Sequence, residues 1–590
     1  MTAEHIFLYA LIVIIFILLI WGRVRYDIVA CAALVVATVA GVVPQEEIFS
    51  GFGHPAVVII ALVLIVSRGL SRSGAIELLA RHIIDASRGL STHIGIMSGI
   101  AAALSAIMNN VAALALLMPV DMQAARQAQR SPSLSLMPLS FASILGGMVT
   151  LIGTPPNIVI ATFRSDALGA PYRMFDFTPV GIVVALAGVV FVTLFGWRLI
   201  PRERSKRDTA RDLMDLEGYI VEIRVGKSSK AVGTVIRELE EIAAEHDVTL
   251  IGLVRRGKRF PGRARGEVIK KSDLIVAEGS PEAIDQFVGA AGLTYRTSEK
   301  DTLMTEAVAV MEAVVPEGAY IEGQSALDVR LLYRQGVTLI GISRQGKKIR
   351  ERVGKVRIKA GDILLLLGPE DNLPDVVSWL GCLQLAERGL EILERRKAWI
   401  AVGVFAAAII GASLGFVYLP LALAGVVVIY ILLRIVPLSQ IYDTIEWPVI
   451  VLLGAMIPIA KALEKSGGTE LVAAVIVKGT AGLPVAAVLA ILMIVTMCLT
   501  AVLNNVATVL IAAPIGIDMA TQLHVNPDAF LMGIAVAASC AFLTPIGHKN
   551  NTIIMGPGGY RFGDYWRMGL PLELIVLIVG IPMILMVWPL

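Results

Sequence analysis

Long apolar runs are the feature that most constrains what this chain can fold into. The runs at 6–21 and 571–590 hold almost no charge, and helices of this length match the hydrocarbon thickness of a bilayer. Hydrophobic residues make up 56% of the 590, with a mean hydropathy of +0.76, above that of a soluble protein of this size. We therefore predict a polytopic membrane protein. No small-residue cleavage site precedes Arg23, so the first run is interpreted as a retained span and not as a signal peptide.

The middle of the chain differs from both ends. Apolar spans fill roughly 6–200 and 398–590, whereas the segment between them has the charged composition of a soluble domain. The formal net charge of +3 is too small to indicate a nucleic-acid partner, and the four cysteines have neither zinc spacing nor a disulfide framework. We predict two membrane repeats around an insert of two modules, with boundaries at 1–201, 202–299, 300–396 and 397–590.

The two apolar parts are related by an internal duplication. Their matching segments occur in the same order and at nearly constant spacing, which indicates a repeat and not coincidence. The matched pairs are 54–80 with 447–473, "MNNVAALALLMP" at 108–119 with "LNNVATVLIAAP" at 503–514, and "IGTPPN" at 152–157 with "IGHKNN" at 546–551.

The arginines predict the topology. They share the cytoplasmic side if the N-terminus lies outside and each half crosses the membrane five times. The segments 92–120 and 484–518 must then enter and return on one side as re-entrant hairpins, each with an Asn pair at its tip. Five is odd, so the repeats are inverted, as in secondary transporters, and the insert 202–396 is cytoplasmic. The arginines concerned are Arg23, Arg25, Arg68, Arg72, Arg126, Arg130, Arg202, Arg204, Arg434, Arg561 and Arg567.

Two helices are predicted to break inside the membrane. Pro155 and Pro156 interrupt the span at 135–163, and Pro545 and Gly547 interrupt the span at 529–557. Non-helical backbone at membrane depth requires protein or a water-filled cavity around it. The fold class is therefore an all-α polytopic membrane protein of inverted five-span repeats, with two re-entrant hairpins and two broken helices.

The insert carries a repeat of its own. "VTLIGLVRRGKR" at 248–259 matches "VTLIGISRQGKK" at 337–348, and "DLIVAEGSPE" at 273–282 matches "DILLLLGPED" at 362–371. Each copy reads as alternating strands with a helix, for example at 230–245. We expect tandem α/β or α+β modules.

These motifs resemble those of a known family. The Asn-bearing tips, "LIGTPPN", "FLTPIGHKNN" and "GPGGYRFGDYWRMGLPLEL" are similar to the divalent anion:sodium symporter family, within the ion transporter superfamily. The insert resembles two TrkA-C domains over 212–384, and the whole looks like the sulfate-transporter-like branch with such inserts. The resemblance implies a homodimer in the cell membrane with elevator motion, sodium as coupling ion and a small divalent anion as substrate. TrkA-C domains often bind small ligands, with a nucleotide as one candidate.

The resemblance also implies site residues. The sodium positions are Ser105, Asn110 and Gly153 in the first half, and Thr500, Leu503, Asn505 and Gly547 in the second. The anion positions that the resemblance implies are Asn109, Asn110, Thr154, Asn504, Asn505 and His548. We add Asn157 and Asn551 as candidates, and also Lys549, because an ionisable residue inside a membrane is a candidate functional group. The sequence departs from the family twice: the tips lack the usual Ser and Thr, which argues against a dicarboxylate, and Lys549 stands where a neutral residue is usual.

Other functional classes fit the sequence less well. The sequence contains no catalytic Ser/His/Asp set, no metal-ligand cluster and no Walker motif, so it supports neither an enzyme nor an ATP-driven pump. A regulated ion channel is the rival class because the insert resembles channel-gating modules, and a transporter-like receptor is a second rival. The site residues also have purely structural interpretations. Asn in a membrane helix can form hydrogen bonds that join helices. Lys549 can extend to the membrane surface or pair with an acid, and His548 can be a structural hydrogen-bonding group.

Overall fold

The computed structural model describes the chain as two compact units. One contains Met1–Ser205, Gly389–Ile554 and Arg561–Leu590, and the other contains Lys206–Arg388 with Met555–Tyr560. The described residues are 3–21, 24–73, 89–128, 130–201, 219–226, 229–246, 248–255, 258–260, 267–279, 281–295, 308–344, 347–349, 353–369, 372–385, 395–438 and 441–590.

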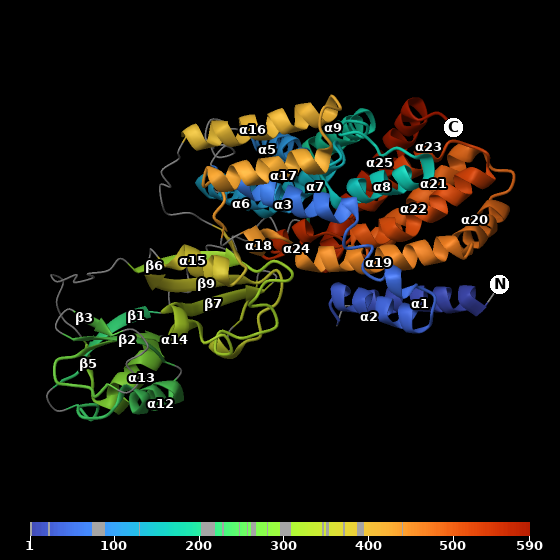
Figure 1. The fold of residues 1–590 in the computed structure, drawn as a ribbon. Coiled ribbons are helices and arrows are strands. Elements are labelled where there is room, and N and C mark those ends of the chain that lie inside the picture. Colours follow the sequence, from blue (N-terminus) through green and yellow to red (C-terminus); the bar gives the residue numbers. More distant parts are fainter. Residues whose placement is uncertain are drawn as a thin grey trace. The chain divides into compact units, whose positions relative to one another are not determined.

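The first unit is helical in both halves (Figure 1). Its first-half elements are α1 (Ala3–Trp21), α2 (Tyr26–Val39), η1 (Gln45–Glu47), α3 (Pro55–Arg72), α5 (Leu90–Ser105), α6 (Asn110–Gln127), α7 (Ser133–Gly147), α8 (Pro155–Leu168), α9 (Thr178–Leu194) and η2 (Gly196–Leu199). Its second-half elements are α16 (Arg395–Ser413), α17 (Leu419–Leu432), α18 (Ile441–Thr444), α19 (Trp447–Lys465), α20 (Gly468–Gly479), α21 (Val485–Thr500), α22 (Asn505–Gln522), α23 (Pro527–Ser539), α24 (Lys549–Met555), η6 (Phe562–Asp564) and α25 (Tyr565–Val587).

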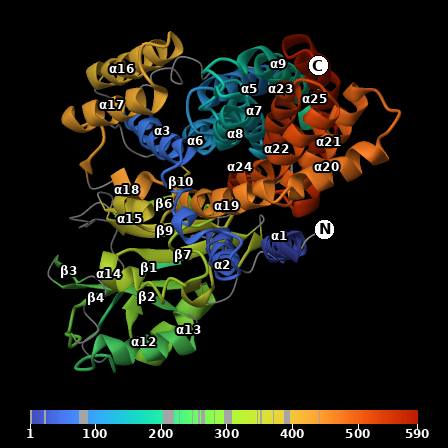
Figure 2. The same cartoon turned by 45° about the vertical axis from the view of Figure 1, so that its right-hand side comes forward.

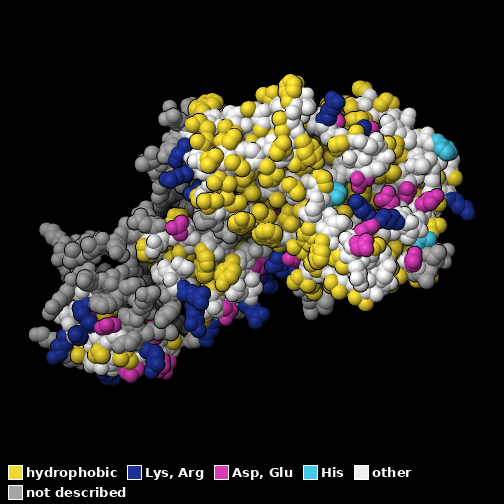
Figure 3. Space-filling view, in the orientation of Figure 1, with side chains coloured by type: hydrophobic (Ala, Val, Ile, Leu, Met, Phe, Trp, Pro, Cys, Tyr) yellow, Lys and Arg dark blue, Asp and Glu magenta, His cyan; other side chains and the backbone are white. Residues whose placement is uncertain are grey.

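Three helical segments among the described residues are long and apolar enough to cross a bilayer: Pro55–Arg72, Trp447–Lys465 and Phe562–Val587. Ten shorter apolar helices accompany them. Hydrophobic side chains cover the face over α3, α16 and α17 (Figure 3), with Trp399 73% and Phe416 80% exposed. A face this apolar suits contact with lipid or with another apolar surface.

Contacts in the two halves correspond. α5, α7 and α9 pack on one another, as do α21, α23 and α25, which lie together in Figure 2. The second helix of each half packs on a helix of the other half: α2 packs on α19, and α17 packs on α3. α8 also packs on α22 and α23, so the halves are interleaved in one core.

The second unit holds two sheets of the same topology. The first sheet has the order β3-β2-β4-β1-β5 and the second β10-β6-β9-β7-β8, both antiparallel, in an α+β arrangement. The first module contains β1 (Tyr219–Arg224), α12 (Ile236–Glu245), β2 (Thr249–Arg255), β3 (Lys258–Phe260), β4 (Leu274–Gly279), α13 (Pro281–Ala291) and β5 (Thr294–Tyr295). The second contains β6 (Val308–Val314), α14 (Leu331–Gln335), β7 (Thr338–Arg344), β8 (Lys347–Lys348), η4 (Val353–Lys355), β9 (Ile363–Pro369), α15 (Leu373–Trp379) and β10 (Leu383–Gln384). The first helix begins at Ile236, later than the predicted 230.

The modules also repeat one ion pair. Arg255 binds Asp273 through Nε at 2.9 Å and a terminal nitrogen at 2.8 Å, and Arg344 binds Asp362 in the same way at 2.8 and 2.7 Å. The hydrogen bond from each guanidinium to its carboxylate raises the pKa of that arginine. Each pair ties the end of a strand (β2 or β7) to the residue just before the next long strand (β4 or β9).

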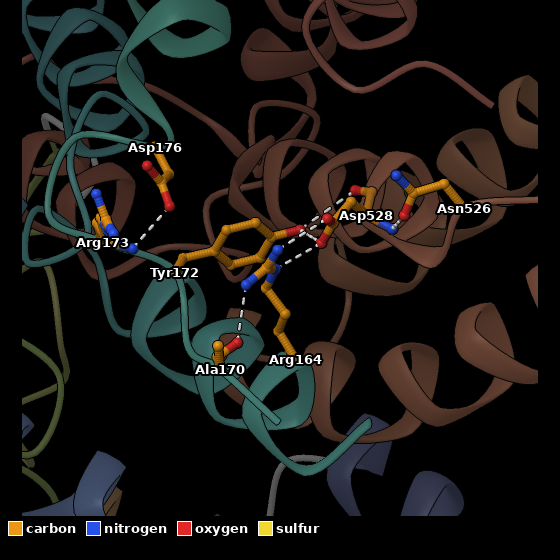
Figure 4. Close-up of polar contacts among 7 residues, drawn as sticks. All are labelled: Arg164, Ala170, Tyr172, Arg173, Asp176, Asn526 and Asp528. Atoms are coloured by element: carbon orange, nitrogen blue, oxygen red, sulfur yellow. Dashed lines mark hydrogen bonds and ion pairs between the residues drawn. The ribbon is translucent and has the colours of Figure 1, made fainter. Parts of the chain in front are cut away.

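A buried ion pair joins the halves of the helical unit (Figure 4). Arg164 on α8 meets Asp528 on α23 in a bidentate arrangement at 2.6 and 3.0 Å, and its remaining nitrogen donates to Ala170 O at 2.8 Å. Tyr172 donates to the same carboxylate at 2.9 Å and lies 4.7 Å from the guanidinium. Asn526 caps α23 by accepting from Asp528 N at 2.9 Å. Arg164, Tyr172 and Asn526 are therefore all held in place by hydrogen bonds to Asp528.

Asp528→Asn should destabilise the protein by about 3 kcal/mol, because it leaves the Arg164 charge without its carboxylate in a mostly buried place. Chemical unfolding in detergent micelles would measure this loss. The matched control is Asp27→Asn, whose partner Arg25 is 63% exposed and whose pair is expected to contribute less than about 1 kcal/mol. Equal losses in the two variants would contradict the assignment of a stabilising pair at Asp528.

Candidate functional site

The two Asn-bearing tips have the same internal hydrogen bond. Between α5 and α6, Ser105 Oγ donates to Asn110 Oδ1 at 2.6 Å. Between α21 and α22, Thr500 Oγ1 donates to Asn505 Oδ1 at 2.9 Å. All four side chains are buried. Each tip thus places a hydroxyl oxygen and a carboxamide oxygen side by side, which are ligand types that hard cations prefer.

The first asparagine of each pair, Asn109 or Asn504, caps the helix that follows it. Asn109 Oδ1 accepts from Val111 N at 2.9 Å, and Asn504 Oδ1 accepts from Ala507 N at 2.8 Å. Both side chains are half-buried. Each oxygen is used for capping, so the NH₂ group is the part of the carboxamide that can donate to a ligand.

The helix breaks repeat a second set of contacts. Thr150 Oγ1 donates to Ala106 O across to the first tip, and Thr544 Oγ1 donates to Ala501 O across to the second. Asn157 Nδ2 donates to Thr150 O at 2.8 Å, as Asn551 Nδ2 does to Thr544 O at 3.2 Å. The structure therefore places Asn157 and Asn551 where they satisfy carbonyls that the breaks leave free.

Close packing at each break depends on glycine. A Cβ on Gly147 would overlap Asn110 Oδ1, and one on Gly153 would lie 3.0 Å from Ser105 O. A Cβ on Gly547 would lie 2.8 Å from Thr500 O. These distances place the backbone of each break against the tip of its own half.

The first tip also meets the second break. Asn110 Nδ2 lies 3.3 Å from His548 Nε2, and Asn550 Nδ2 donates to Asn110 O at 3.1 Å. Asn550 also donates to Ser143 Oγ at 2.7 Å, and Ser140 Oγ donates to Asn551 Oδ1 at 2.8 Å. The site residues of the two halves are thus joined by hydrogen bonds from α6 and α7 to His548 of the second break and to the start of α24.

Lys549 has a partner that the sequence did not reveal. Its Nζ donates to Glu446 Oε2 at 2.6 Å, with side chains 29% and 28% exposed. Glu446 precedes α19 and is 103 positions away along the chain. The ammonium next to His548 is therefore offset by a carboxylate in this conformation.

Sequence reasoning missed other members of the network. Asn550 stands opposite Pro156 in the duplication, so the repeat did not single it out. Ser140 and Ser143 lie in an apolar helix, where only their spacing of three residues hinted at a polar face. Of the predicted members, Thr154 is buried just before α8 and Leu503 is buried at the second tip, near the residues named above.

Two broken helices and two Asn-bearing tips that meet in a buried polar centre are features of a membrane transporter. The chain matches the family described as citrate transporter (CitMHS) over residues 16–520 and 485–590. It belongs to this family of transporters, and it is therefore an integral membrane protein.

The chain is similar to several individual proteins. An uncharacterized transporter of Synechocystis sp. is 32% identical over 591 residues, which cover 98% of this chain and 96% of the relative. Sodium/sulfate cotransporter 2 of Chlamydomonas reinhardtii is 24% identical over 350 residues, which cover 55% of this chain and 38% of the relative. The crystal structure of the Alcanivorax borkumensis YdaH transporter matches with a TM-score of 0.41 and 13% identity, covering 91% of this chain and 86% of that one.

Gly147→Ala should reduce substrate uptake by roughly tenfold or more. The added methyl group would displace the Asn110 carboxamide, and a loss of about 1.4 kcal/mol of binding free energy already corresponds to a factor of ten. Initial uptake rates in proteoliposomes would measure the effect. Gly99→Ala on α5 is the control, because a Cβ there meets nothing within 4 Å. Unchanged uptake by Gly147→Ala would show that the position of Asn110 is not critical.

Proposed function

We propose that this chain is a secondary active symporter of a small divalent anion, coupled to sodium, with sulfate as first candidate and a di- or tricarboxylate as second. The observation that carries the proposal is the pair of equivalent tips, Ser105 with Asn110 and Thr500 with Asn505. A relative is named a sodium/sulfate cotransporter, which favours the same substrate and coupling ion.

Two sodium positions follow from the tips. We assign the first to Ser105, Asn110 and Gly153, and the second to Thr500, Leu503, Asn505 and Gly547. Hydroxyl, carboxamide and backbone oxygens are available at both, which suits a hard cation. The described residues contain no group of three or more His, Cys, Asp or Glu side chains that could hold a metal, so the site does not favour a transition metal.

The anion would bind between the tips and the breaks. The NH₂ groups of Asn109 and Asn504 can donate to it, as can those of Asn110 and Asn505. The N-termini of α6, α8 and α22 favour negative charge nearby. Thr154, His548 and Lys549 complete the proposed site. Asn157 and Asn551 support it by holding the breaks and do not contact the anion in this proposal. Asn and Val flank the central asparagine of each tip, where the family has Ser and Thr. Each tip therefore lacks two hydroxyl groups that could donate to a dicarboxylate, and the compact sulfate ion is favoured.

The proposed transporter function also implies an overall architecture. We propose inverted repeats of five spans with re-entrant hairpins, a homodimer in the cell membrane, and elevator motion of the domain that carries the site. The insert 202–396 would lie in the cytoplasm as two TrkA-C-like modules. A small ligand such as a nucleotide would regulate transport by binding one transporter state more tightly than another.

Asn110→Ala and Asn505→Ala should each abolish sulfate uptake in proteoliposomes under an imposed sodium gradient, because each removes a ligand shared by the sodium and anion positions. Asn372→Ala is the control, since this exposed residue of the second module makes no side-chain cap bond. Circular dichroism would verify folding. Accumulation of sulfate or succinate against its own gradient also separates a symporter from a channel, which cannot concentrate its ion. Normal uptake by either tip variant would refute the assignment.

Lys549→Gln should weaken the apparent anion affinity at low sodium by roughly tenfold, because hydrogen bonds to charged groups contribute about 1.5–3 kcal/mol. Glu446→Gln should strengthen it, because the anion would no longer compete with a carboxylate for the ammonium. Half-saturation constants for sulfate at several sodium concentrations would be compared among the wild type and both variants. If both leave the affinity and the sodium Hill slope unchanged, the pair serves only the fold.

A further inference from the structure

Glu573 is a buried acid in the middle of an apolar helix. It lies on α25, within the segment Phe562–Val587 that is long and apolar enough to span a bilayer. At a rise of about 1.5 Å per residue, it is roughly 16 Å from one end of that segment and 21 Å from the other. Its side chain is only 5% exposed. An acid at this depth is a candidate functional group, because a charge there is costly.

One face of α25 braces the second helix break. Tyr565 donates to Asn551 O at 2.6 Å. One turn later, a Cβ on Gly569 would overlap the Phe542 carbonyl oxygen, so helix and break touch there. After one further turn, the backbone N–H of Phe542 faces the Glu573 carboxyl group. Of these three residues at a spacing of four, Tyr565 contacts α24, which follows the break, and Gly569 and Glu573 contact the break itself at Phe542.

The Glu573 carboxyl group has an oxygen with no partner. Among the described residues, its Oε1 is buried without a hydrogen bond. Of the elements packed on α25, the helices α9 and α21 contain no charged residue, and α23 contains only Asp528, which pairs with Arg164.

The remaining titratable groups around Glu573 are few. Cys540, just after α23, faces the carboxyl group, and Cys498 lies on α21. The nearest charged groups along the chain are Asp564 and Arg567, both N-terminal to Glu573, and η2 contributes Arg198. None of these supplies the hydrogen bond that Oε1 lacks among the described residues. A buried carboxylate in such surroundings is expected to hold a proton.

The first half contains a helix equivalent to α25, namely α9, and both helices are preceded by the same cap. Before α9, Asp176 accepts from Arg173 N at 2.8 Å (Figure 4), just as Asp564 accepts from Arg561 N at 2.8 Å before α25.

These matched caps align the two helices, and Gly181 then corresponds to Gly569. A Cβ on Gly181 would likewise meet the first break, at Met148 O. The same alignment places buried Ala185 opposite Glu573. An apolar side chain thus suffices for this packing, and the carboxyl group in the second half needs another explanation.

We propose that Glu573 is a proton-binding site of this transporter. The carboxylate takes up one proton to become a neutral carboxylic acid and releases it again, and its protonation state controls the break at 540–548 through Phe542. Proton binding itself follows from the geometry of Glu573, whereas its effect on uptake rests on the proposed symport function.

Infrared spectroscopy of the full-length protein in lipid tests the proton directly. The wild type should show the carbonyl-stretch band of a protonated carboxylic acid at neutral pH, and Glu573→Gln, which keeps the size and a hydrogen-bonding oxygen, should lose it. Glu46→Gln, at an exposed position, is the matched control and should keep the band. An identical band in wild type and Glu573→Gln would overturn the proposal. Should Glu573→Gln fold poorly, Glu573→Asp should shift the band instead of removing it.

Uptake measurements test whether protonation of Glu573 affects transport. With equal sodium on both sides, an inward proton gradient should stimulate sulfate uptake by the wild type and by Glu46→Gln, and this response should be lost in Glu573→Gln. Sodium-driven uptake at constant pH should persist in Glu573→Gln. A proton response retained by Glu573→Gln, or absent from the wild type while sodium drives uptake, would overturn the coupling. If the wild type takes up no sulfate at all, the proposed function fails, and the infrared result still decides whether Glu573 binds a proton.

Discussion

Two helices of this protein are interrupted, and the backbone N–H and C=O groups at the interruptions need hydrogen-bond partners. The rest of the structure depends on this requirement. Between α7 and α8, and again between α23 and α24, the chain leaves the helical hydrogen-bond pattern inside an apolar protein. Side chains from the helices that follow the breaks supply the missing partners: Asn157 of α8 donates to Thr150 O, and Asn551 of α24 donates to Thr544 O. Because such groups are costly to bury without partners, each substitution among them is expected to disturb the whole centre.

The same contacts explain how a site forms at the breaks. Thr150 and Thr544 tie each break to the tip of its own half, while His548 and Asn550 tie the second break to Asn110 of the first half. Hydroxyl, carboxamide and backbone oxygens thereby come together with amide donors. A cation and an anion can both find suitable ligands in such a place, which is the chemical basis of the proposed symport.

Differences between the halves matter as much as their similarity. Lys549 stands opposite Pro155, and Glu573 opposite Ala185, so these two ionisable residues have apolar counterparts in the first half. The pair of Arg164 and Asp528 joins unlike positions of the two halves. The duplication accounts for the arrangement that the two halves share. The positions at which the halves differ carry the charged residues, which two identical halves would not have.

The sequence by itself determined the helical membrane character, the duplication, the two breaks and the asparagines at the tips, because these depend on local composition and on order along the chain. The family match agrees with the transporter class. Only the tertiary structure decided that Lys549 meets Glu446, that Asn550 bridges Asn110 and Ser143, and that Glu573 lies against Phe542. Those partners are between 31 and 440 positions apart along the chain, so packing of distant helices brings them together and no local pattern encodes them.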